Sequence, residues 1–279
     1  MAGDAADATT ILPSPSPSSA AVVDRPEPRS VGLLEPAPDG VAERFAETVG
    51  PRNPVRVFLA AIFSGYALLV ALMIAIGLVL TEVILPIGNL EREDNDINRW
   101  LADNRSPGLE DASWVGSTLA GGHVIPVVVG GLLITFLVMR RWLLAAFTLF
   151  AISVESGSYR ATTLVVERDR PPVERLESLP VEASFPSGHT AASVALFGGL
   201  LLLLASRVQR GWFWALTWVL VIAIPLFVAW ARLYRGMHHV TDVVAGLLMG
   251  ALALTVTVFA ARAATAAAAR RDAAERSTS

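Results

Sequence analysis

Long apolar stretches separated by short polar segments dominate the chain between residues 57 and 261. Each of six stretches approaches the roughly 20 residues that an α-helix needs to cross the hydrocarbon core of a bilayer. They run over Val57–Thr81, Val115–Met139, Trp142–Val166, Thr190–Ser206, Gly211–Ala231 and Val240–Ala261. The pattern predicts an all-α membrane protein with six transmembrane helices in a bundle.

The polar segments predict the rest of the organisation. Residues 1–50 are rich in Ala, Pro and Ser without apolar periodicity, which indicates a disordered cytoplasmic tail. Residues 51–265 form the six-span domain, and residues 266–279 form a cytoplasmic C-terminal tail. The loop after the first span predicts two short amphipathic helices, with Ser106 and Pro107 at the start of the second.

The arginines between the spans predict the orientation. If the spans alternate in direction, one side receives Arg52, Arg56, Arg140, Arg141, Arg207, Arg210, Arg262, Arg270 and Arg271. Positively charged loops remain in the cytoplasm, so we expect both termini there, in a multi-pass protein of the cell membrane. The remaining loops then lie on the extracytoplasmic side.

Composition narrows the possible chemistry. Hydrophobic residues make up 53% of the 279 residues and charged residues 17%, which excludes an ordinary soluble domain. The chain has no cysteine, which excludes thiolate catalysis and disulfides. A net charge of -3 without a basic block indicates no nucleic-acid partner. The bilayer is therefore the expected partner, and the oligomeric state stays open.

Three polar segments are expected to meet at the extracytoplasmic face. They are "TLVVERDRPPVE" at the end of span three, "FPSGH" at the start of span four, and "ARLYRGMHHVTD" between spans five and six. Together they carry three of the four histidines, several arginines and an aspartate. Such residues at one membrane level indicate a functional site.

His238 and Asp242 stand four residues apart at the start of span six, on one helical face. A carboxylate that accepts a hydrogen bond from one ring nitrogen leaves the other nitrogen free as a nucleophile. The alternative is an interfacial histidine beside an aspartate that interacts with the helix dipole.

Arg170 and Arg232 are candidate phosphate ligands, because guanidinium groups bind phosphoryl oxygens in pairs. The alternative is that they extend to lipid headgroups. Arg168 and Arg235 are interpreted as surface charges.

Ser187, Gly188 and His189 open span four, where a helix start offers unpaired N–H groups to an anion. Glycine allows close approach of a phosphate oxygen, and His189 can protonate a leaving group as general acid. Ser187 as an ordinary helix cap beside an interfacial histidine is the plainer interpretation.

These motifs resemble the signature segments of the type-2 phosphatidate phosphatase superfamily, in its membrane branch. The matching residues are Arg170-Pro171, then Pro186-Ser187-Gly188-His189, then Arg232, His238 and Asp242. The resemblance covers roughly residues 55–262 and implies a metal-independent hydrolase of lipid phosphates, with no cofactor. It assigns His238 as the nucleophile and His189 as the general acid.

The first segment departs from the family pattern. Thr163 stands where the family usually has lysine, and the chain contains no lysine. We expect Arg160, one turn earlier, to supply the missing cation, with the Thr163 hydroxyl as a weaker donor. Glu155 lies within span three, where a carboxyl group is usually paired or functional.

The sequence thus predicts a phosphatase that hydrolyses a lipid phosphate monoester or diphosphate, of the phosphatidate or polyprenyl diphosphate type, through a phosphohistidine. A metal-dependent hydrolase is an alternative, with zinc on His189, His238, His239 and Asp242. A second alternative, suggested by Thr163, is a catalytically impaired lipid-phosphate-binding or transport protein of the same fold.

Overall fold

The computed structural model describes residues 32–178, 182–206 and 211–278, and within these ranges every regular element is a helix. Several helices are long and apolar enough to cross a membrane: Pro54–Ile87, Trp142–Thr163, Gly188–Ala205, Gly211–Tyr234 and Val240–Thr278. A bent pair, α5 (Pro107–Leu119) and α6 (Val124–Val138), adds a sixth if it counts as one span. The prediction of an all-α, multi-span protein is confirmed at this level.

The predicted second span, Val115–Met139, is not one continuous helix. The axes of α5 and α6 differ by 43°, and the break contains Gly121 and Gly122, which weaken a helix interior. Helix α5 packs against α10 (Gly211–Tyr234) instead of continuing α6. The contact is close, because a Cβ atom on Gly116 would lie 2.8 Å from the Ala231 Cβ.

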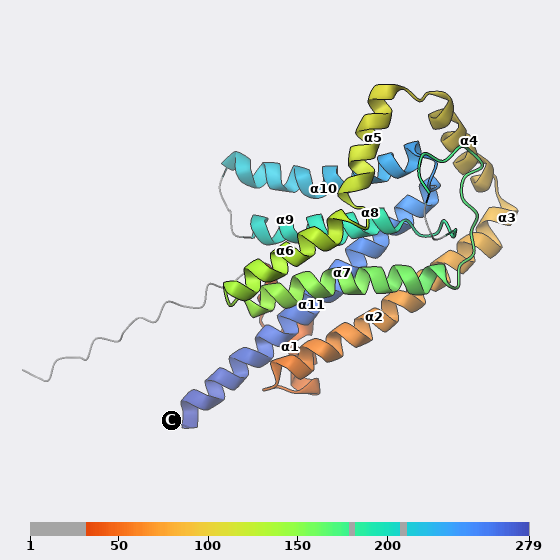
Figure 1. Ribbon diagram of the computed structural model, residues 1–279. Coiled ribbons are helices and arrows are strands. Elements are labelled where there is room, and N and C mark those ends of the chain that lie inside the picture. Colours follow the sequence, from red (N-terminus) through yellow and green to blue (C-terminus); the bar gives the residue numbers. More distant parts are fainter. Residues whose placement is uncertain (1–31, 179–181, 207–210, 279) are drawn as a thin grey trace, which may run out of the picture. The chain divides into compact units, whose positions relative to one another are not determined.

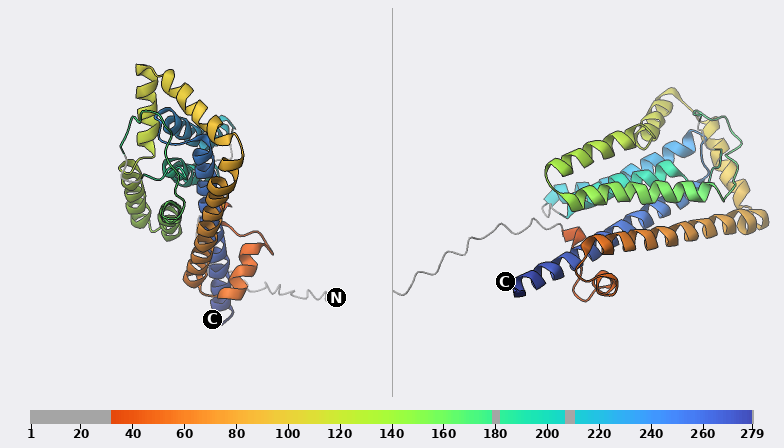
Figure 2. Two further views of the ribbon diagram at one scale, coloured as in Figure 1. Left: turned by 90° about the vertical axis from the view of Figure 1, so that its right-hand side faces the viewer. Right: turned by 60° about the horizontal axis from the view of Figure 1, so that its bottom comes forward.

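The long helices lie side by side (Figure 1). Helix α2 (Pro54–Val79) continues through a π-helical turn into α3 (Leu85–Ile87) and packs along α11 (Val240–Thr278). Helix α7 (Trp142–Thr163) contacts both α2 and α11, and α6 packs on α7. Figure 2 shows α2 and α11 adjacent in two further views.

One helical run begins at the signature segment and crosses the bundle. It consists of α8 (Gly188–Ser193), a π-helical turn (Val194–Gly198) and α9 (Gly199–Ala205). Helix α11 approaches it closely through two glycines: a Cβ atom on Gly246 would lie 2.5 Å from the Ser187 carbonyl oxygen, and one on Gly250 equally near that of Ala191. Small residues four apart allow two backbones to meet in this way, so α11 holds the start of α8.

Residues 32–50 differ from the expected disordered tail, whose first 31 residues lie outside the described ranges. Gly32–Leu34 forms a 3₁₀ turn whose Leu34 is buried, and α1 (Val41–Val49) packs on α11. The apolar face of α1 provides Ala42 and Ala46 for a small cluster with alanines of α11. Helix α11 itself continues without interruption to Thr278, through the expected C-terminal tail.

Helices α4 (Leu90–Asp103) and α5 lie at one end of the bundle, together with the long connection between α7 and α8 (Figure 1). Helix α4 contacts α10 and α11 there. Buried polar side chains of α4, α5, α10 and α11 gather at this end, among them Asp94, Ser113, Ser117, Arg232 and Asp242. The candidate site lies among them.

Candidate active site

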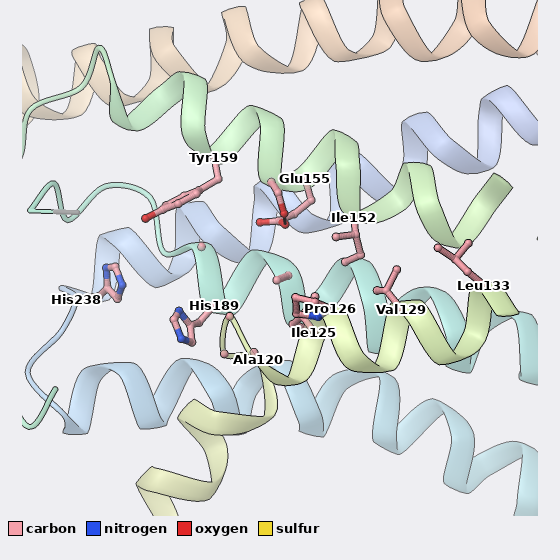
Figure 3. Close-up of a pocket in the computed structure, with 16 residues that line it drawn as sticks. Ala120, Ile125, Pro126, Val129, Leu133, Ile152, Glu155, Tyr159, His189 and His238 are labelled. Atoms are coloured by element: carbon pink, nitrogen blue, oxygen red, sulfur yellow. Dashed lines mark hydrogen bonds between the residues drawn. The ribbon is translucent and has the colours of Figure 1, made fainter. Parts of the chain in front are cut away.

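A cavity of about 640 Å³ opens between α6, α7 and α8. His189, in the first turn of α8, and His238, just before α11, both line it at the same end (Figure 3). Apolar residues of α6, including Ile125, Val129 and Leu133, line the cavity away from the imidazoles. The structure therefore brings the two predicted imidazoles together beside an apolar channel.

The His238 ring is held by a backbone carbonyl rather than by the predicted aspartate. Its Nδ1 lies 2.8 Å from the Ser184 carbonyl oxygen but 3.9 Å from Asp242 Oδ2. A carbonyl only accepts, so Nδ1 carries the proton and Nε2 keeps a free lone pair. Burial lowers the pKa of His238 well below its ordinary value, and the charge of Arg232 lowers it further. The ring is therefore neutral at pH 7.

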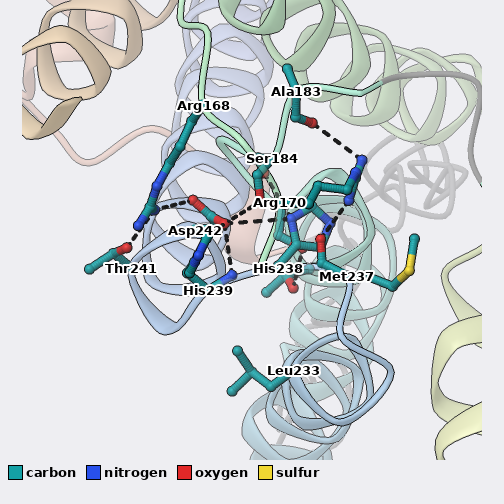
Figure 4. A network of polar contacts seen from close by, with 12 residues as sticks. Arg168, Arg170, Ala183, Ser184, Leu233, Met237, His238, His239, Thr241 and Asp242 are labelled. Carbon is teal, nitrogen blue, oxygen red and sulfur yellow. Dashed lines mark hydrogen bonds and ion pairs between the residues drawn. The ribbon is translucent and has the colours of Figure 1, made fainter. Parts of the chain in front are cut away.

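Asp242 is an anchor for the segments around His238 (Figure 4). Its Oδ2 accepts hydrogen bonds from Ser184 Oγ at 2.6 Å and from the His239 backbone N–H at 2.8 Å. Its Oδ1 pairs with Arg168. The aspartate thus acts on His238 largely through Ser184, because its carboxylate lies 3.9 Å from the ring nitrogen, beyond hydrogen-bond distance.

Arg168 and Arg235 are buried, so their interpretation as surface charges is wrong. Arg168 also donates to Asp94 of α4 at 2.9 Å and to Thr241 Oγ1 at 2.6 Å. Arg235 Nε donates to Glu177 at 2.5 Å. Both arginines are thus buried in ion pairs with carboxylates from distant segments.

Arg232 is fully buried, and only one of its three guanidinium nitrogens is hydrogen bonded within the described residues. Its Nη1 donates to Ser117 Oγ and to Glu177, the latter at 2.6 Å. Its Nε and Nη2 have no hydrogen-bond partner there. Burial alone would raise the pKa of Glu177, but Arg232, Ser117 and Arg235 outweigh it and hold that pKa at about 2. Arg232 therefore offers unused donors to an anion.

Arg170 joins two of the signature segments. It donates to the Met237 carbonyl at 2.5 Å and to the Ala183 carbonyl at 3.2 Å. It also lines a second cavity, of about 850 Å³, together with Arg160 and Thr163. The Thr163 hydroxyl donates to the Arg160 carbonyl at 3.1 Å.

Neither Arg160 nor Thr163 lines the cavity that contains the imidazoles. The side chain from α7 that does so at the imidazole end is Tyr159 (Figure 3). Thr163 lies one helical turn beyond Tyr159, at the end of α7, and together with Arg160 it lines the second cavity instead.

Ser187 and Gly188 are tightly packed at the start of α8. Ser187 is buried; its Oγ lies 2.9 Å from Thr190 Oγ1, and its N–H donates to the Asp242 carbonyl at 3.0 Å. A Cβ atom on Gly188 would lie 3.0 Å from the Tyr159 ring. A side chain at 188 would therefore crowd the tyrosine ring, a packing role for this glycine that the sequence did not indicate.

His239 turns away from the cavity. Its Nδ1 lies 3.2 Å from Asp242 Oδ2, and its Nε2 lies 3.1 Å from Asn95 Oδ1. The four residues of the alternative zinc site do not converge, and no group of three or more His, Asp or Glu side chains suited to a metal occurs among the described residues.

Several residues of the site were not identified from the sequence. Ser184 lies three residues before Ser187 and could have been noticed as part of that segment. Ser117 of α5 and Glu177 of the long connection carry no local signal, because only the fold brings them to Arg232.

Comparisons with known proteins agree with these motifs. Residues 141–265 match the model of the PAP2 superfamily. The chain carries a PAP2 superfamily domain. The matched residues extend from the start of α7 into α11 and contain all three signature segments, so the predicted resemblance is confirmed.

Two curated relatives show the range of similarity. Sphingosine-1-phosphate phosphatase 2 of Homo sapiens is 38% identical over 88 residues, which are 31% of this chain and 22% of that protein. Undecaprenyl-diphosphatase of Sulfolobus acidocaldarius is 31% identical over 135 residues, 47% of this chain and 60% of that protein. The matched regions therefore span from about a fifth to three fifths of these relatives.

One solved structure shares the fold of the PAP2 domain. It is a transmembrane PAP2-type phosphatidylglycerolphosphate phosphatase from Bacillus subtilis, with a TM-score of 0.57 at 19% identity, covering 74% of this chain and 94% of that one. The likeness supports the helical arrangement described above, and the chain's own long apolar helices make it a multi-pass membrane protein.

Proposed function

We propose that this protein is a metal-independent membrane phosphatase that hydrolyses a lipid phosphate monoester or diphosphate. The observation that carries the proposal is that His189 and His238 line one end of a single cavity. Arg232, whose charge acts on the His238 ring, has two buried nitrogens with no hydrogen-bond partner among the described residues. A bound phosphoryl group would satisfy both nitrogens and lie between the imidazoles.

The chemistry assigned to these residues has two steps. In the first, His238 Nε2 attacks phosphorus, the bond from phosphorus to the leaving oxygen breaks, and His189 gives that oxygen its proton. In the second, water attacks the phosphohistidine, His189 takes a proton from the water, and the P–N bond breaks to release phosphate. Arg170, Arg232 and the N–H groups of Gly188 and His189 stabilise the equatorial oxygens.

Arg160 and Thr163 enter this proposal in a changed role. They line the neighbouring cavity, and unlike Arg170, whose charge acts on the His238 ring, neither contributes to the electrostatics of that ring. We therefore assign them to the approach of the anionic headgroup instead of direct phosphate binding. The relatives are named for a sphingosine 1-phosphate and an undecaprenyl diphosphate activity, and both a monoester and a diphosphate fit the proposal here.

The membrane orientation is also part of the proposal. We assign six spans, with the α5–α6 pair as the bent second one. If the six spans alternate in direction, the arginine-rich connections and the histidine-containing segments lie on opposite sides of the membrane. By the positive-inside rule the termini are cytoplasmic and the site is extracytoplasmic.

The test uses the full-length protein purified in detergent, without added metal, against phosphatidate, lysophosphatidate and polyprenyl diphosphate. Phosphate release is expected from at least one lipid, and His238→Ala is expected to abolish it. His123→Ala is the matched control, because His123 is exposed at the α5–α6 break and does not line the cavity. Alkaline quenching during turnover of a ³²P-labelled substrate should trap label on the wild-type protein.

One observation keeps a second function open. Thr163 replaces a lysine of the family pattern, and its hydroxyl is bonded within its own helix. If the protein binds lipid phosphates but is catalytically impaired, these lipids should raise its thermal unfolding temperature without any release of phosphate. Binding without turnover in the same panel would favour that function over the phosphatase.

A further inference from the structure

The cavity beside the imidazoles contains a carboxyl group that the proposed mechanism does not use. Glu155 lies on α7 one turn from Tyr159, with 1% of its surface exposed, and both residues line the cavity (Figure 3). The rest of the cavity lining is largely apolar and includes Ile125, Val129 and Ile152 (Figure 3). A carboxyl group in such surroundings requires hydrogen-bond partners.

Only part of this requirement is met inside the protein. Ser156 Oγ donates to Glu155 Oε2 at 2.8 Å. Within the described ranges, no cation lies at ion-pair distance from Glu155, and its Oε1 has no hydrogen bond to another group. An entirely hydrocarbon occupant of the cavity would leave Oε1 unsatisfied. The occupant that fits therefore brings a donor of its own to this point.

The position of Glu155 sets where that donor must be. Gly188, next to His189, touches the Tyr159 ring, so Tyr159 marks the level at which phosphate would bind. Glu155 is four residues from Tyr159, which is about 6 Å along the helix. A donor at Glu155 is thus close to the phosphate, before the long apolar part of the lipid reaches Val129 and Leu133.

We propose that Glu155 selects lipid phosphates that carry a hydroxyl or amino group near the phosphate ester, over those whose chain is pure hydrocarbon. This inference rests on the proposed function and narrows its substrate class. Long-chain amino-alcohol phosphates and lysophosphatidates belong to the favoured class, and polyprenyl phosphates do not. The carboxyl group accepts the hydrogen bond, while the imidazoles act on phosphorus.

A matched substrate series tests the proposal: hexadecyl phosphate, 2-hydroxyhexadecyl phosphate and 2-aminohexadecyl phosphate, in mixed micelles. Wild-type kcat/KM is expected to be about tenfold or more higher for the two donor-bearing lipids. Glu155→Leu should reduce this ratio to about one while keeping hexadecyl phosphate hydrolysis. Ser153→Leu is the control, because Ser153 is exposed on the same helix and does not line the cavity.

The variant Glu155→Gln distinguishes a loss of substrate preference from a folding defect, because it keeps the size and a hydrogen-bonding group of the side chain. It should keep the preference for hydroxyl over hydrogen and lose any preference for amino over hydroxyl, and it decides the case if Glu155→Leu is not monodisperse. Equal kcat/KM for all three lipids, or a preference that survives in both variants, would overturn the inference while leaving the phosphatase intact. If no lipid is hydrolysed, the proposed function fails, and thermal protection by the same three lipids tests the selection by Glu155.

Discussion

At the scale of single residues, the candidate site depends on groups that bind the Asp242 carboxylate and thereby position the His238 ring. Asp242 makes no hydrogen bond to the His238 ring; it accepts one from Ser184 Oγ, and the Ser184 carbonyl accepts one from His238 Nδ1. Arg168 and the His239 N–H complete the shell of Asp242. The orientation of the nucleophile is therefore set by the conformation of the Ser184 backbone.

Ser184→Ala tests this arrangement. Loss of the hydroxyl removes the 2.6 Å bond to Asp242 and frees the carbonyl to move. Because a net hydrogen bond to a charged group is worth about 1.5–3 kcal/mol, we expect kcat to fall at least tenfold with KM little changed. Ser184→Thr keeps the hydroxyl and should restore most of the rate. Steady-state kinetics that show equal loss in both variants would contradict a role for this hydroxyl.

Glu177 predicts a pH dependence of stability. Its pKa in the folded protein is about 2, below the ordinary 4.5, so the folded state binds the proton more weakly than the unfolded state. The stabilisation is complete above pH 4.5 and is lost as the pH falls from 4.5 toward 2. Thermal unfolding followed between pH 7 and pH 3 should show wild type above Glu177→Gln, with the difference shrinking on acidification. A constant difference would argue against this ion pair with Arg232 and Arg235.

At the scale of helices, the contact between α8 and α11 positions the site. Gly246 and Gly250 allow α11 to approach the Ser187 and Ala191 carbonyls, at the start of the helical run whose first turn contains His189. Asp242 lies in the first turn of α11 and binds the Ser187 N–H through its carbonyl. A change in the distance between these helices would thus separate the two imidazoles.

Gly250→Ala tests the helix contact. Its Cβ would lie 2.5 Å from the Ala191 carbonyl oxygen and 2.7 Å from Val194 Cβ, so the helices must shift. Overpacking of this kind costs about 1–3 kcal/mol, and phosphate release should fall with stability. Gly131→Ala is the matched control, since a Cβ there meets no atom within 4 Å and alanine favours the helix. Thermal unfolding and turnover of the two variants should differ clearly; equal behaviour would disprove the close contact.

At the scale of the whole chain, residues far apart in sequence complete the site. Ser117 of α5 and Glu177 of the connection before α8 both bind Arg232 of α10, and Asp94 of α4 binds Arg168. Helix α5 reaches Arg232 because the predicted second span bends by 43° at Gly121 and Gly122. The bend that the hydropathy pattern did not reveal therefore contributes a wall of the site.

The sequence by itself determined the helical, multi-span character and the signature residues, because apolar length and local spacing are properties of a single segment. His189 and His238, which it predicted to face each other, line one cavity. It could not show that Arg168 is buried, that Thr163 faces another cavity, or that Ser184 holds the His238 ring. Those facts depend on the rotation and spacing of packed helices, which only the tertiary structure decides, because each is set by contacts between segments up to about 150 residues apart.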